Sequence, residues 1–145
     1  MLSCTEQKVL EEIYRGSRTA LLDIHSMIGK VYDEELAYDL NRQAARYSRL
    51  GEKAADNLLA EGVIVQPVGI LDRAKRWAAI QAETALNVST EHVAQMIKKE
   101  EIRRLESIED ILSRNRVTGS VSCELAEEFM AFERENINIL GSYHI

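Results

Sequence analysis

The chain has 145 residues, of which 46% are hydrophobic and 29% charged, with seven glycines and one proline. This length and composition are typical of one compact helical domain that needs neither disulfides nor a metal to hold its core. The formal net charge of -6 argues against nucleic acid and anionic membranes as partners. No stretch reaches the roughly 20 apolar residues of a membrane span, and no targeting segment is recognisable, so we expect a cytoplasmic protein.

The first half of the chain predicts two long helices, over about residues 5–31 and 33–61. In both, apolar or small residues recur at alternating spacings of three and four, which is the pattern of a helix packed in a bundle. Thr5 and Asp33 are the expected N-caps. The connection between the two helices is so short that they must form an antiparallel hairpin.

The second half predicts a short helix over about 70–86 and two long helices over about 90–114 and 122–142. The only proline, Pro67, lies in the connection that precedes the short helix. A helix of 25 residues is roughly 38 Å long, and the connection from about residue 62 to 89 can span that length. It therefore allows the second and third long helices to run parallel.

These elements predict an all-α fold with a single domain over 1–145. The expected architecture is a ferritin-like four-helix bundle with one long crossover that contains a short extra helix.

Charged residues interrupt the apolar stripe of the third long helix. Glu101 and Arg104 occupy inward or boundary positions three residues apart, a spacing that permits an ion pair. Under a weak internal repeat, Glu101 and Arg104 correspond to Ser17 and Ala20 of the first helix. One hypothesis is a buried pair that faces the small residues Gly16, Ser17 and Ala20, which would leave room for it. The alternative is that both side chains pass a boundary position and keep their charged ends in water.

Other polar residues also fall on the stripes that should face the core. Each is either a satisfied core or boundary group, or part of a hydrogen-bonded network or small polar pocket. No Ser-His-Asp or Cys-His arrangement and no phosphate loop is present, so we expect no catalytic residue. The candidates for a polar core are Gln43, Tyr47, His92, Glu101, Arg104, Glu133 and Asn136.

The ligand pattern of a di-iron or di-manganese bundle is missing. Such centres take Glu-x-x-His from two helices, because that spacing brings both ligands to one face. His25, His92 and His144 have no glutamate three residues before them. The sequence therefore predicts no metal and no cofactor; the alternative is an iron- or manganese-binding bundle with oxidoreductase or storage activity and an unusual ligand set drawn from Glu12, Glu52, Glu101 and Glu133.

The two cysteines, Cys4 and Cys123, have no zinc or redox spacing and are expected to be ordinary small side chains. With one crossover, the first and last helices would begin at the same end of the bundle. A reversible bond between the two cysteines is then the alternative.

Four segments of the chain resemble ferritin-like bundle proteins of unassigned function from anaerobic and spore-forming bacteria. They are "YRGS" at 14–17, "LNRQAARY" at 40–47, "STEHVAQMI" at 89–97 and "FERENI" at 132–137. The resemblance implies a ferritin-like fold and often a dimer, and it does not imply iron. This chain has Glu100 and Glu101 where similar proteins repeat a Gly-Ser pair.

The leading hypothesis is a non-catalytic protein that acts by association, as a homodimer or with a protein partner. Leu71, Trp77 and Ile80 of the crossover helix are the interface candidates, because interfaces favour large rigid side chains. The alternative is that Trp77 seals the side of the bundle.

Overall fold

The computed structural model describes residues 2–85, 87–114 and 121–143, and all regular structure in these ranges is helical. Helices α2, α3, α4 and α5 begin and end within one residue of the predicted ranges. The elements in chain order are α1 (Cys4–Met27), a 3₁₀ turn η1 (Ile28–Lys30), α2 (Glu34–Ala60), α3 (Ile70–Ala85), α4 (Thr90–Arg114) and α5 (Val121–Gly141).

The first helix begins and ends earlier than expected. The Ser3 hydroxyl accepts a hydrogen bond from the Glu6 amide at 3.1 Å, and the Glu6 carboxylate accepts one from the Ser3 amide at 3.3 Å. This capping box makes Ser3 the N-cap, so the prediction of Thr5 is wrong. The α-helix ends at Met27, and the chain tightens into η1 before it reaches α2.

The second helix has the expected cap and stop. The Asp33 carboxylate accepts a hydrogen bond from the Leu36 amide at 2.8 Å, which satisfies one of the free donors at the helix start. Gly62 follows the helix with φ of 78°, a left-handed conformation that glycine adopts without steric cost. The chain then leaves α2 in an extended connection.

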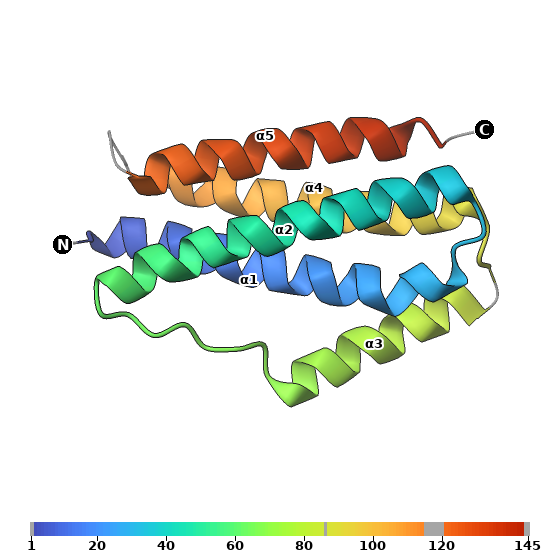
Figure 1. The fold of residues 1–145 in the computed structure, drawn as a ribbon, viewed down its shortest axis with the longest axis horizontal. Coiled ribbons are helices and arrows are strands. Elements are labelled where there is room, and N and C mark those ends of the chain that lie inside the picture. The colour runs from blue at the N-terminus through green and yellow to red at the C-terminus, as the bar shows by residue number, and fades with distance from the viewer. Residues whose placement is uncertain (1, 86, 115–120, 144–145) are drawn as a thin grey trace.

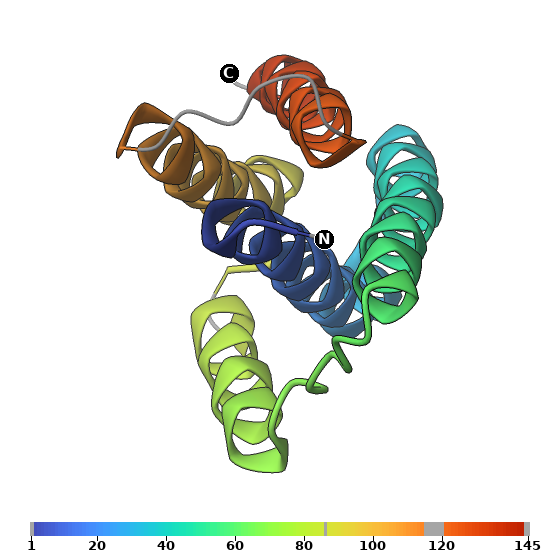
Figure 2. The same cartoon turned by 90° about the vertical axis from the view of Figure 1, so that its left-hand side faces the viewer.

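The four long helices lie side by side, and α3 lies outside them (Figures 1 and 2). Helices α1 and α2 are antiparallel, as are α4 and α5, whereas α2 and α4 run in the same direction (Figure 1). The connection that contains α3 returns the chain to the end where α2 began. This is the direction that the length of the connection predicted.

Side chains of all four long helices form one hydrophobic core, and α3 adds Ile80 to it. Among the largest fully buried side chains are Leu10, Ile13, Ile24, Leu36, Leu40, Tyr47, Leu50, Leu58, Ile108, Phe129 and Leu140. Helix α3 packs on α1, and most of its remaining surface is exposed. Within the described residues, none of the helices is both long and apolar enough to cross a membrane.

Candidate functional site

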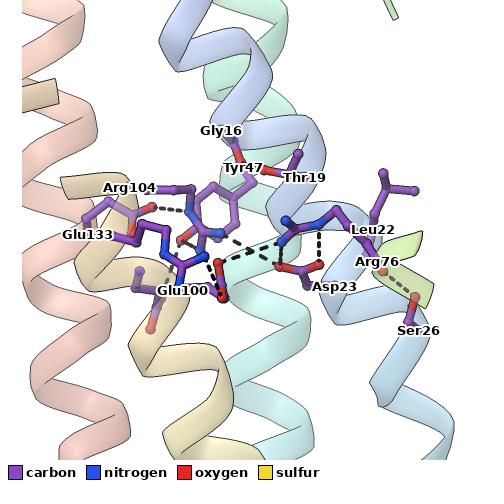
Figure 3. A network of polar contacts seen from close by, with 12 residues as sticks. Gly16, Thr19, Leu22, Asp23, Ser26, Tyr47, Arg76, Glu100, Arg104 and Glu133 are labelled. Atoms are coloured by element: carbon purple, nitrogen blue, oxygen red, sulfur yellow. Dashed lines mark hydrogen bonds and ion pairs between the residues drawn. The ribbon is translucent and has the colours of Figure 1, made fainter. Parts of the chain in front are cut away.

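Five polar side chains from three helices meet inside the core. Tyr47 comes from α2, Glu101 and Arg104 from α4, and Glu133 and Asn136 from α5. Tyr47, Glu101 and Glu133 are 0% exposed, Asn136 is 1% exposed and Arg104 is 9% exposed. We call these five residues the core network; Figure 3 shows Tyr47, Arg104 and Glu133 facing one another.

The Tyr47 hydroxyl is the centre of the core network. It donates a hydrogen bond to Glu101 Oε2 at 3.3 Å. It accepts hydrogen bonds from Arg104 Nη2 at 3.2 Å and from Asn136 Nδ2 at 3.4 Å. One phenol therefore links helices α2, α4 and α5 and uses both its donor and its acceptor capacity.

The arginine has room because the facing helix carries a glycine. A Cβ on Gly16 would lie 3.3 Å from Arg104 Cδ and 3.4 Å from Phe129 Cζ. The stem of Arg104 therefore packs directly against the backbone of α1, and its Nε lies 3.6 Å from Glu133 Oε1. Glu101 and Arg104 are both buried, so their charged ends do not lie in water. The acidic partners of Arg104 in the structure are Glu133 and Asp23, on α5 and α1, rather than Glu101.

Burial decides the electrostatics of the two glutamates. It raises the pKa of Glu101 well above the usual value, Glu133 raises it further, and Arg104 offsets only part of the effect. Burial also raises the pKa of Glu133, against the lowering effect of Arg104. Two buried carboxylates share one arginine, so the proton-bearing form of one of them is favoured.

Arg104 itself stays charged. Burial would lower its pKa, but Tyr47, Glu133 and Glu101 raise the pKa above that of an ordinary arginine. Burial raises the pKa of Tyr47 well above the usual value, so the phenol keeps the proton that it donates. The network thus has one fixed cation surrounded by acids that resist ionisation.

A chain of ion pairs connects this network with α3 (Figure 3). Arg104 Nη1 lies 3.9 Å from Asp23 Oδ2 on α1. Arg76 of α3 donates to both oxygens of the same carboxylate, with Nε at 3.0 Å from Oδ1. Glu100 of α4 lies 3.9 Å from Arg76, so helices α1, α3 and α4 are joined at one point.

Asp23 is the central member of this chain. Its side chain is 5% exposed, and burial raises its pKa while Arg76 and Arg104 lower it. The C-terminal half of α3 is fastened separately, because Lys30 Nζ donates to Thr84 Oγ1 at 2.9 Å and to Gln81 Oε1. Two polar attachments therefore fix the position of α3 along α1.

Several buried polar atoms near the network have no hydrogen-bond partner among the described residues. They are both amide atoms of Gln43, Glu101 Oε1, Arg104 Nε and both carboxylate oxygens of Glu133. Ser17 Oγ is in the same condition, and Ser17 packs under Gly51 of α2. Buried polar groups without a hydrogen bond lower the free energy of unfolding. Apolar packing in the core must offset this loss.

The remaining predicted polar residue lies elsewhere. His92 is half-buried near the start of α4, with its ring Nε2 3.3 Å from the Glu83 carbonyl oxygen. It connects α3 to α4 and takes no part in the core network.

The four glutamates proposed as an unusual metal ligand set are not brought together. Glu52 is exposed on α2, and Glu133 is paired with Arg104 inside the core. No group of three potential metal ligands occurs among the residues that the structure describes.

The interface candidates on α3 separate into two kinds. Leu71 and Trp77 are 76% and 57% exposed, whereas Ile80 is 8% exposed and belongs to the core. The prediction for Ile80 is therefore wrong, because this side chain faces α1. Trp77 is more than half exposed and borders a hollow together with Leu22 and Ser26 of α1.

Cys4 is the first residue of α1, and Cys123 lies in the first turn of α5. These two helices begin at the same end of the molecule (Figure 1). Cys4 is exposed and Cys123 is partly buried. No disulfide joins them in this structure.

Sequence reasoning missed Asp23, Arg76 and Glu100. Asp23 precedes Ile24 on the inward face of α1. An acidic residue at such a position could have predicted a buried carboxylate with a basic partner. Arg76 gave no such signal, because the face of α3 that meets α1 cannot be recognised from its own pattern.

Comparisons with known proteins give no relative for this chain. No family model matches it, and no match was found among curated proteins or solved structures.

Proposed function

We propose that this protein is a non-catalytic, ferritin-like bundle that acts through self-association, as a homodimer formed by α3. The observation that carries the proposal is an exposed apolar stripe on that helix. A surface helix normally turns charged residues to water and apolar residues to the core, and α3 instead has apolar residues on both faces.

The outward stripe of α3 has the period of a helix that packs against another helix. Its members are all exposed and follow one another at spacings of three and four: Leu71, Ala74, Ala78, Ala82 and Ala85. The opposite face carries Arg76, Ile80 and Thr84, which bind α1. Ile70 and Trp77, 83% and 57% exposed, lie along one side of the stripe.

A second copy of α3 is the partner that fits this stripe best. In a two-fold symmetric dimer the same patch meets itself, and an antiparallel pairing centred on Ala78 would place Leu71 opposite Ala85. Large side chains would then meet small ones at both ends. Alanine in the middle permits helix axes to approach to about 8 Å, over a helix about 24 Å long.

The order and direction of the helices support the ferritin-like assignment. The parallel α2 and α4, joined by a long connection that contains an extra helix, follow the one-crossover arrangement of that fold. The position of α3 outside the four long helices leaves its stripe available to a partner (Figure 2).

Ala78→Glu is the sharpest test of the interface. Residue 78 is exposed in the single chain, so the new carboxylate costs nothing in a monomer but is buried beside its symmetry mate in the proposed dimer. Sedimentation velocity should give a dimer for the wild-type chain and a monomer of 16.4 kDa for the variant, at unchanged helicity.

Ala45→Glu is the matched control, because Ala45 is an exposed alanine on α2. This variant should remain dimeric. A dimer that survives Ala78→Glu, or one that Ala45→Glu disrupts equally, would exclude α3 as the interface.

A further inference from the structure

A small hollow between α1, α3 and α4 collects positive charge on a chain that is acidic overall. Four of the residues that line it are arginines: Arg15 from α1, Arg76 from α3, and Arg103 and Arg104 from α4. Its volume is about 140 Å³. We infer that this hollow, the arginine hollow, binds a small oxyanion, namely a phosphate group.

The arginines at the rim of the hollow supply the charge that is available to a ligand. Glu12 and Glu100 also line the hollow, and Arg76 and Arg104 are paired with Asp23 behind it, whereas Arg15 and Arg103 are exposed. Glu100 is shared between Arg103 at 3.5 Å and Arg76 at 3.9 Å. These distances are long for an arginine–carboxylate hydrogen bond, so both guanidinium groups keep donors for a ligand.

The inner wall is fixed before any ligand arrives. Arg104 is held by Tyr47 and Glu133, and Arg76 is held by Asp23. The three guanidinium nitrogens of Arg104 face Tyr47, Glu133 and Asp23, so Arg104 forms a fixed wall. The Arg76 guanidinium, held in place by Asp23, loses little conformational freedom when an anion binds. A planar guanidinium also offers paired donors that match the oxygens of phosphate.

The outer wall has unused donors. Arg15 is exposed and makes no ion pair with any residue that the structure describes, and Ser107 has no hydrogen-bond partner within the same ranges. The Thr19 hydroxyl, by contrast, donates to the Gly16 carbonyl at 3.1 Å. Arg15, Arg103 and the Ser107 hydroxyl are the groups free to close over an anion.

A neighbouring hollow bears on whether the phosphate is free or esterified. It shares Arg76, Glu100 and Arg103 with the arginine hollow, and its volume is about 220 Å³. Its lining includes the apolar side chains of Met27, Ile80, Met96 and Ile97. If a phosphate monoester bound with its phosphate in the arginine hollow, its organic part could pack against the apolar lining of this neighbouring hollow.

The test is calorimetric titration of the full chain with inorganic phosphate and, separately, with phenyl phosphate at low ionic strength. We expect saturable binding of at least one of them, and the tighter of the two tells whether the group is free or carried by an organic molecule. Arg15→Gln and Arg103→Gln should each weaken that binding about tenfold. Both residues are exposed, so the variants should fold normally, which circular dichroism and thermal melting would verify.

Arg49→Gln is the control. Arg49 is an exposed arginine on α2 that does not line the hollow, and this substitution removes the same charge as the other two. Its affinity should equal that of the wild-type chain. Absence of binding up to about 10 mM of both compounds, or equal weakening in all three variants, would overturn the proposal.

Discussion

Arg104 is the residue on which the buried charges depend. Arg104 pairs with Glu133 and Asp23 and donates to Tyr47, and its charge also lowers the pKa of Glu101. Buried ion pairs seldom add net stability relative to apolar side chains, but removal of one partner leaves the other uncompensated. The network therefore contributes little net stability, and its effect is to favour one register of the long helices.

Arg104→Met should lower the free energy of unfolding by about 3–5 kcal/mol, because it leaves the two glutamates without a cation. Chemical denaturation would measure the loss. Arg103→Met is the neighbouring control: the Arg103 side chain is 64% exposed and pairs with Glu100 at the surface, so its loss should cost less than about 1 kcal/mol. Equal effects would contradict the central role of Arg104.

The acids of the network should make stability depend on pH with a definite sign. Because the pKa values of Glu101 and Glu133 are raised in the folded state, the folded chain retains protons that the unfolded chain releases. The free energy of unfolding should therefore fall as pH rises from about 4.5, the ordinary pKa of glutamate, through the raised values.

Glu101→Gln should flatten this fall, since it removes one of the two carboxylates and preserves an acceptor for Tyr47. Denaturation midpoints between about pH 4.5 and 8 would record the slope. Glu52→Gln, at an exposed position, should leave the slope unchanged. A variant at position 101 with the wild-type slope would contradict the assigned coupling.

At the scale of elements, α3 is the helix with the weakest attachment. Most of its contacts run to α1, through Ile80, the Asp23–Arg76 pair and the hydrogen bonds of Lys30. Arg76 and Glu83 also contact α4, at Glu100 and His92. An element with few buried apolar contacts opens at low free energy. The same property makes α3 suited to meet a partner and sensitive to the loss of any one attachment.

Asp23→Asn should loosen α3 without unfolding the other helices. A hydrogen bond to a charged group contributes about 1.5–3 kcal/mol, so amide protons of α3 should exchange with solvent about tenfold faster or more, while those of α2 and α5 keep their rates. Hydrogen–deuterium exchange with mass spectrometry would resolve this. Asp56→Asn, exposed on α2, should change nothing, and uniform acceleration over all helices would refute a local role.

Periodicity predicted the helices well because each long helix buries one apolar stripe along its whole length. The same stripes located Tyr47, Glu101, Arg104, Glu133 and Asn136, since a polar residue in an apolar register must enter the core. Periodicity predicted the helix ends less precisely. Ser3 and Thr5 are both acceptable N-caps, and Ser3 is the cap because Glu6 completes a capping box with it.

The attachments of α3 could not be predicted. Arg76 meets Asp23 across 53 residues of sequence, and neither residue indicates its partner. Ile80 was assigned to the wrong face for a related reason: a helix with apolar residues on two faces does not tell which face the rest of the chain will cover. Only the packed structure distinguishes the face on α1 from the outward stripe.

At the scale of the whole molecule, we propose that the outward stripe of α3 makes two chains pair, and that the core network keeps the long helices in the register that presents α3. The proposed phosphate site lies between α1 and α4 rather than on the outward stripe, so it can fail without affecting the dimer.

Sedimentation velocity of the wild-type chain over a wide range of concentration tests the central claim most directly. The account predicts a species of twice the 16.4 kDa mass of the chain that dissociates on dilution as one reversible step. A single species of 16.4 kDa at every concentration would contradict it.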